Sequence, residues 1–132
     1  MTNIVILSGN VGQNPETSTY DRTQVTRFSM ATSRPRYSNG EIIRDKNGRA
    51  EQDTEWHRVT AFNGVSKSLR NCVKGMRVLV IGRNKTNRWT DKDGAVHYTT
   101  EVIAEKVEFL SWPKPKNEND DGKFIEDDEI PF

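Results

Sequence analysis

The feature that most constrains this chain is the alternation of residues 54–62, Thr-Glu-Trp-His-Arg-Val-Thr-Ala-Phe. Its β-branched and aromatic content and its period of two favour a strand over a helix. One face of the predicted strand carries Trp56, Arg58, Thr60 and Phe62, and the other carries Glu55, His57, Val59 and Ala61. The smaller face suits a protein core. The aromatic face suits stacked bases on a phosphate backbone, although two such aromatics on a strand more often pack inside a core.

The remaining hydrophobic segments predict four further strands and one helix. Residues 3–7 contain the continuous apolar run Ile-Val-Ile-Leu, which predicts a buried strand, and further strands are expected at 24–32, 76–81 and 98–109. The apolar spacing of residues 65–74 predicts a short amphipathic helix that Gly75 ends, and Gly82 predicts a bulge or a bend. This order is typical of an all-β, five-stranded OB barrel with one short helix and extended β-hairpin loops.

The length and cysteine content limit the other possibilities. The 132 residues suffice for one domain and a tail. No apolar run approaches a membrane span and no signal peptide pattern opens the sequence, so a cytoplasmic location is expected. The single cysteine, Cys72, excludes an internal disulfide and a thiolate metal cluster, and no cofactor or metal is expected.

Charge is distributed unevenly along the chain. Residues 118–132 hold seven acidic residues and one lysine, whereas residues 1–117 hold 19 basic and 12 acidic residues. A basic body with an acidic tail recurs in nucleic-acid-binding proteins, although an acidic tail can also serve solubility alone.

Two turn-rich segments concentrate the basic residues. Residues 33–53 carry two Asn-Gly steps, and Asp93-Gly94 predicts the turn of a second hairpin. The candidate side chains are Arg34, Arg36, Tyr37, Arg44, Lys46 and Arg49 in the first segment and Lys85, Arg88 and Trp89 in the second. Each segment is interpreted either as a charged finger over nucleic acid or as a mobile surface loop.

Enzymatic alternatives are weaker. Asp53, Glu55 and His57 share one face of the extended segment and could hold a divalent metal for phosphodiester cleavage. Neighbours at this spacing lie about 6–7 Å apart, which is wide for one metal. The glycines of Gly-Asn-Val-Gly at 9–12 lack the Lys-Ser/Thr of a phosphate loop and predict a bulge or turn. The chain is therefore not expected to be an enzyme.

Several motifs, in order and spacing, resemble those of bacterial single-stranded DNA-binding proteins. They are Gly-Asn-Val-Gly-Gln-Asn-Pro-Glu at 9–16, Ala-Thr-Ser at 31–33, Thr-Glu-Trp-His-Arg-Val at 54–59, Trp-Thr-Asp at 89–91, Tyr-Thr-Thr-Glu-Val at 98–102 and Asp-Asp-Glu-Ile-Pro-Phe at 127–132. The resemblance implies an OB fold, a homotetramer, and single-stranded DNA binding with little sequence preference in replication, recombination and repair.

The resemblance also implies roles for particular residues. Bases are expected to stack on Trp56, Phe62 and Trp89, beside Arg58, while basic hairpin residues follow the phosphates. His57 is expected at a subunit interface, or as a hydrogen-bonded strand histidine. Tyr37 stands near the position where the family often has a tryptophan, so it is either a smaller stacking surface or a bystander beside the arginines.

The expected domains are an OB domain for DNA binding and oligomerisation at 1–110 and a disordered linker with an acidic tail at 111–132. The linker is shorter than is usual in the family. The resemblance implies that replication, recombination and repair proteins bind the tip, and that the protein associates with the nucleoid. The tip residues are Asp127, Asp128, Glu129, Ile130, Pro131 and Phe132.

Overall fold

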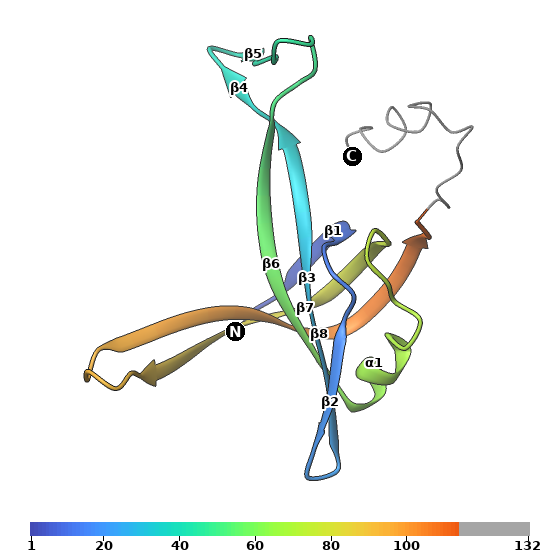
Figure 1. Cartoon of the computed structure of the whole chain (residues 1–132), viewed down its shortest axis with the longest axis vertical. Coiled ribbons are helices and arrows are strands. Elements are labelled where there is room, and N and C mark those ends of the chain that lie inside the picture. Colours follow the sequence, from blue (N-terminus) through green and yellow to red (C-terminus); the bar gives the residue numbers. More distant parts are fainter. Residues whose placement is uncertain (114–132) are drawn as a thin grey trace.

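The computed structural model describes residues 1–113 of the chain, in which the strands form a curved sheet that closes on itself (Figure 1). The elements are β1 (Val5–Val11), β2 (Glu16–Tyr20), β3 (Thr23–Pro35), β4 (Tyr37–Ser38), β5 (Glu41–Ile42), β6 (Gln52–Phe62), α1 (Asn63–Ser68), β7 (Arg77–Thr90) and β8 (Val96–Ser111). The strand order is β1-β7-β8-β6-β3-β2, and β1 also pairs with β3. That extra pairing closes the barrel.

The barrel has the predicted five-stranded connectivity, but its first strand is broken. β1 pairs with β7, whereas β2, which the sequence pattern did not predict as a strand, pairs with β3 from Glu16↔Arg27 to Tyr20↔Thr23. Only Val59↔Val102 and Thr60↔Ile103 join β6 to β8, in parallel. The one helix lies between β6 and β7, as predicted.

The barrel interior is filled by apolar side chains from all the long strands and from the segment after α1. The largest fully buried ones are Met30, Met76, Val11, Val59, Val78 and Val80. Cys72 is also buried in this core, and burial raises the pKa of its thiol to about 11. The thiol is therefore protonated at neutral pH and acts as a small packed residue, although Cys72 lies beyond the end of α1.

Two sequence predictions are wrong in detail. Ile4 and Ile6 are each 64% exposed, because alternate residues of this apolar run point away from the barrel. The helix ends at Ser68 rather than near residue 74, because the following amides of Leu69, Arg70 and Cys72 bond three residues back, to Ser66, Lys67 and Leu69, in a tighter series of turns.

Three hairpin arms project from the barrel (Figure 1). β3 and β6 stay paired up to Pro35↔Gln52 and carry the small β4–β5 hairpin, whose Asn39-Gly40 turn has the positive φ angles expected of an Asn-Gly turn. β7 and β8 extend together to the turn before Val96, and β2 and β3 form the third arm. The long excursion at 33–53 is therefore a paired, structured arm rather than a loop.

Candidate nucleic-acid interface

The proposed stacking face lies on β6 and continues onto β3. Trp56 is 63% exposed, Arg58 is exposed and Phe62 is 38% exposed at the end of the strand. Thr60, on the same face, is buried; it pairs with Arg27 of β3 on one side and with Ile103 of β8 on the other. The face is thus one aromatic–arginine pair and a separate phenylalanine, rather than a continuous stripe.

The ring of Trp56 lies against the backbone of Gly12. A Cβ at Gly12 would stand 2.4 Å from Cζ3 of Trp56, so only glycine leaves room for the indole there. Gly12 is held in turn by its N–H, which donates to the Ser29 carbonyl at 2.8 Å. Trp56 and Arg58 also line an open pocket of about 480 Å³ together with Gly12, Gln13, Ser29 and His57. A flat ring with a basic neighbour and an open pocket beside it is suited to a nucleotide.

Arg27 was missed by the sequence reasoning. It pairs in register with Thr60 and is exposed, and alternation places it on the same side of β3 as Ser29, which pairs with Arg58. It also lowers the pKa of the Tyr20 hydroxyl, after the larger effect of a hydrogen bond with Ser18. The sequence contained a signal for this position, because Thr26, Phe28 and Met30 alternate on one face of the strand and leave Arg27 on the other. The structure buries those three residues and exposes Arg27.

Trp89 lies at the far end of the β7–β8 hairpin, where it is 49% exposed. Its ring stacks on His97, with ring centroids 4.4 Å apart and planes at 21°. Nε2 of His97 lies 2.6 Å from Oδ2 of Asp91, and this hydrogen bond, with a smaller contribution from the Ala95 N–H, lowers the pKa of the Asp91 carboxyl. Lys85 and Arg88 are exposed on the same arm.

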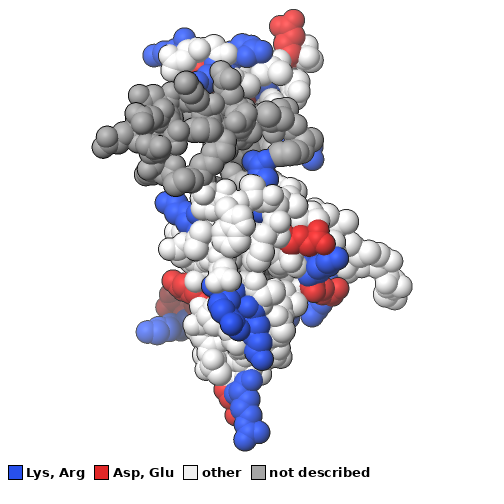
Figure 2. All heavy atoms as spheres, turned by 90° about the vertical axis from the view of Figure 1, so that its right-hand side faces the viewer, with Lys and Arg blue, Asp and Glu red and all other residues white. Residues whose placement is uncertain are grey.

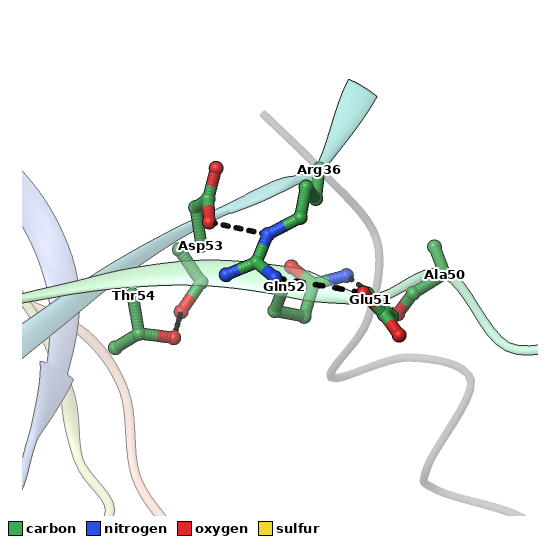
Figure 3. A network of polar contacts seen from close by, with 7 residues as sticks. Arg36, Ala50, Glu51, Gln52, Asp53 and Thr54 are labelled. Atoms are coloured by element: carbon green, nitrogen blue, oxygen red, sulfur yellow. Dashed lines mark hydrogen bonds and ion pairs between the residues drawn. The ribbon is translucent and has the colours of Figure 1, made fainter. Parts of the chain in front are cut away.

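The two arginines at the start of the β3–β6 arm differ in whether they pair with carboxylates. Nε of Arg36 lies 2.8 Å from Oδ1 of Asp53, and its Nη1 lies 3.6 Å from Oε2 of Glu51 (Figure 3). The Asp53 hydrogen bond is the main cause of the raised pKa of Arg36. Arg34, by contrast, is exposed, and no described carboxylate pairs with it.

At the end of this arm the remaining candidates surround a compact turn. Oδ1 of Asp45 accepts the N–H groups of Asn47 and Arg49, and Nη1 of Arg44 donates to the Gly48 carbonyl at 3.0 Å. Lys46 is exposed in this turn, and Tyr37 is 60% exposed on β4. The arm therefore brings Arg34, Tyr37 and Lys46 to one structured projection.

Two of the three side chains considered for a catalytic metal site make other contacts in the structure. Asp53 is bound by Arg36, and Nε2 of His57 lies 2.9 Å from Oγ1 of Thr32. Within residues 1–113, no three His, Cys, Asp or Glu side chains are grouped so that they could hold a metal ion. No helix in the same part of the chain is long and apolar enough to span a membrane.

The face seen from the right of Figure 1 has a mixed charge. Where the surface is visible, basic and acidic side chains lie in small mixed groups, and uncharged surface separates these groups (Figure 2). No single-sign patch is visible on this face, and the β7–β8 arm projects from the opposite side of the barrel (Figure 1).

A small closed barrel with aromatic and basic residues on its outer sheet and arms defines an oligonucleotide-binding protein of the OB class. Residues 2–110 match the model of the single-strand binding protein family, and the chain belongs to that family.

Two relatives of known name and one solved structure agree with the family assignment. Single-stranded DNA-binding protein 1 of Xylella fastidiosa is 33% identical over 95% of this chain and 88% of its own length. The single-stranded DNA-binding protein of Bacteroides thetaiotaomicron is 35% identical over 87% of this chain and 69% of its own. The structure of Plasmodium falciparum SSB in complex with ssDNA superposes with a TM-score of 0.67 at 28% identity, covering 84% of this chain and 97% of that one.

Proposed function

We propose that this protein binds and protects single-stranded DNA with little sequence preference during replication, recombination and repair. The observation that carries the proposal is the exposed pair Trp56 and Arg58, with the indole seated on Gly12. A ring that is covered on one side and exposed on the other can stack on any base, because every base has a π-face. The names of the relatives support the same ligand. The role is non-catalytic.

Titration of the protein with oligo-dT of increasing length, followed by tryptophan fluorescence, tests the proposal. Fluorescence should fall on binding, and duplex DNA or hairpin RNA should compete poorly. Equal competition by the duplex would overturn the preference for single strands. Incubation of a labelled strand with magnesium or manganese should leave it at full length.

Phosphate neutralisation should make binding depend on salt. The residues proposed to follow the phosphates are Arg34, Arg44, Lys46, Arg49, Lys85 and Arg88, while Arg36 is already paired with two carboxylates. Arg34→Ala should therefore reduce the magnitude of the log–log salt slope by about 0.7, the value for one phosphate contact on a single strand. Arg36→Ala should change the slope less.

The control for this experiment is Arg70→Ala, since Arg70 is exposed just beyond α1 and belongs to neither the β3–β6 arm nor the β7–β8 arm. A slope that is unchanged in Arg34→Ala, or reduced equally in Arg70→Ala, would remove the β3–β6 arm from the path of the strand.

We also propose that the protein is a homotetramer, with residues 1–110 as the binding and oligomerisation domain. Two exposed isoleucines near the start of the chain support association: Ile4 directly precedes β1, Ile6 lies within it, and Ile6 pairs in register with Ile81 of β7. Exposed apolar rows of this kind are typical of protein interfaces. His57, bonded to Thr32, is proposed at a further subunit contact. Sedimentation during the titration measures the stoichiometry.

The acidic tip, Asp127 to Phe132, lies outside the described residues, and its proposed role comes from the sequence alone. We propose that it captures replication, recombination and repair proteins, and that the protein acts in the cytoplasm at the nucleoid. Acidic residues speed encounter with a basic patch, and Ile130 and Phe132 can fill a small pocket.

Deletion of residues 126–132 should abolish partner capture. DNA affinity should stay unchanged or rise slightly at low salt, because the tail no longer competes for the basic surface. A pull-down from cell extract compares the intact and truncated proteins. Identical partner profiles would reduce the tail to a device for solubility.

A further inference from the structure

Three side chains at the end of the β7–β8 arm form a connected unit. Trp89 and His97 are direct cross-strand partners, and their rings stack at 4.4 Å. The other end of the imidazole meets the Asp91 carboxylate at 2.6 Å. The second oxygen of Asp91 accepts the N–H groups of Asp93 and Ala95, each at 2.9 Å, so the carboxylate is itself fixed by the turn.

This arrangement restricts the indole. An exposed tryptophan on a two-stranded arm would otherwise sample several rotamers, and binding a base would then cost the entropy of ordering it. Here the imidazole covers one face of Trp89, and the hydrogen bond to Asp91 sets the plane of the imidazole. The exposed half of the Trp89 surface therefore consists of the opposite face of the indole and its edges.

We propose that His97, oriented by Asp91, is a positioning residue that holds Trp89 as a preformed platform with one open face for a single base. The inference deepens the proposed single-stranded DNA binding and rests on it. It assigns to His97 no contact with DNA: its effect reaches the strand only through the Trp89 ring, in a column of base, indole and imidazole.

A double-mutant cycle on the full chain tests the inference. Oligo-dT affinity is measured for the parent, Trp89→Ala, His97→Ala and the double variant. His97→Ala should weaken binding about 2- to 10-fold in the parent, as expected for loss of an aromatic pair. It should have no further effect once Trp89 is alanine. His97→Phe, which keeps a flat ring behind the indole, should restore affinity to within about twofold of the parent.

A second readout needs no DNA. In a Trp56→Phe, Trp112→Phe background, the remaining tryptophan reports on Trp89 alone. Its emission should shift to longer wavelength when His97→Ala is added, because a second face of the indole then meets water. With His97→Phe, which again covers that face, the emission should stay close to that of the His97 protein. Equal emission with histidine and alanine at position 97 would overturn the stack.

The two proposals fail differently. If the parent does not bind oligo-dT, the proposed function is wrong. If the parent binds and Trp89→Ala weakens binding, but His97→Ala has no effect or the same effect in both backgrounds, only the positioning role is wrong.

Discussion

Alanine at both Trp56 and Trp89 should weaken oligo-dT binding by about 2–6 kcal/mol, from about 1–3 kcal/mol for each stacked base. The two rings lie on different strands and have different supports: Gly12 lies under Trp56, and His97 lies behind Trp89. Their losses should therefore add. Fluorescence titration of each single variant and of the double variant measures both the losses and their additivity.

Trp112→Ala is the matched control. Trp112 is also exposed, but it lies beyond β8 with its ring tilted against Phe109, at centroids 6.0 Å apart. Its loss should leave oligo-dT affinity unchanged. If the Trp56 and Trp89 variants fold normally and bind as tightly as the parent, the stacking face lies elsewhere.

Gly82→Ala should destabilise the protein by about 3 kcal/mol, at the upper end of the usual cost of overpacking. A Cβ at Gly82 would stand 2.0 Å from the carbonyl oxygen of Ile103, which belongs to the backbone of β8 and cannot rotate away. Gly82 also sits at a register shift between β7 and β8, as its place in the sequence predicted. Urea unfolding followed by far-UV circular dichroism measures the loss.

Gly64→Ala provides the contrast. Gly64 lies in α1, and a Cβ there meets nothing within 4 Å. The same chemical change should stabilise the chain by up to about 1 kcal/mol, because alanine is the better helix former. Equal stability of the Gly82→Ala protein and the parent would show that β7 and β8 can separate without cost.

The sequence alone determined the elements whose signal is local. The alternation of residues 54–62 predicted β6, and the Asn39-Gly40 and Asp93-Gly94 steps predicted turns that have the positive φ their glycines permit. These features depend on near neighbours in the chain, whose geometry the residue types themselves restrict. The order of strands and helix then implied the barrel.

Only the tertiary structure decided which distant groups meet. Alternation placed Thr60 on the same face as Trp56, but Thr60 is buried in the structure. The sequence marked Arg36 as a free basic side chain, but Asp53 and Glu51 pair with it. The supports of the two tryptophans, Gly12 and His97, follow from the packing of one strand or arm on another. A periodic pattern reports the face on which a side chain lies. What covers that face depends on the register and closure of strands far apart in sequence, which local pattern leaves undefined.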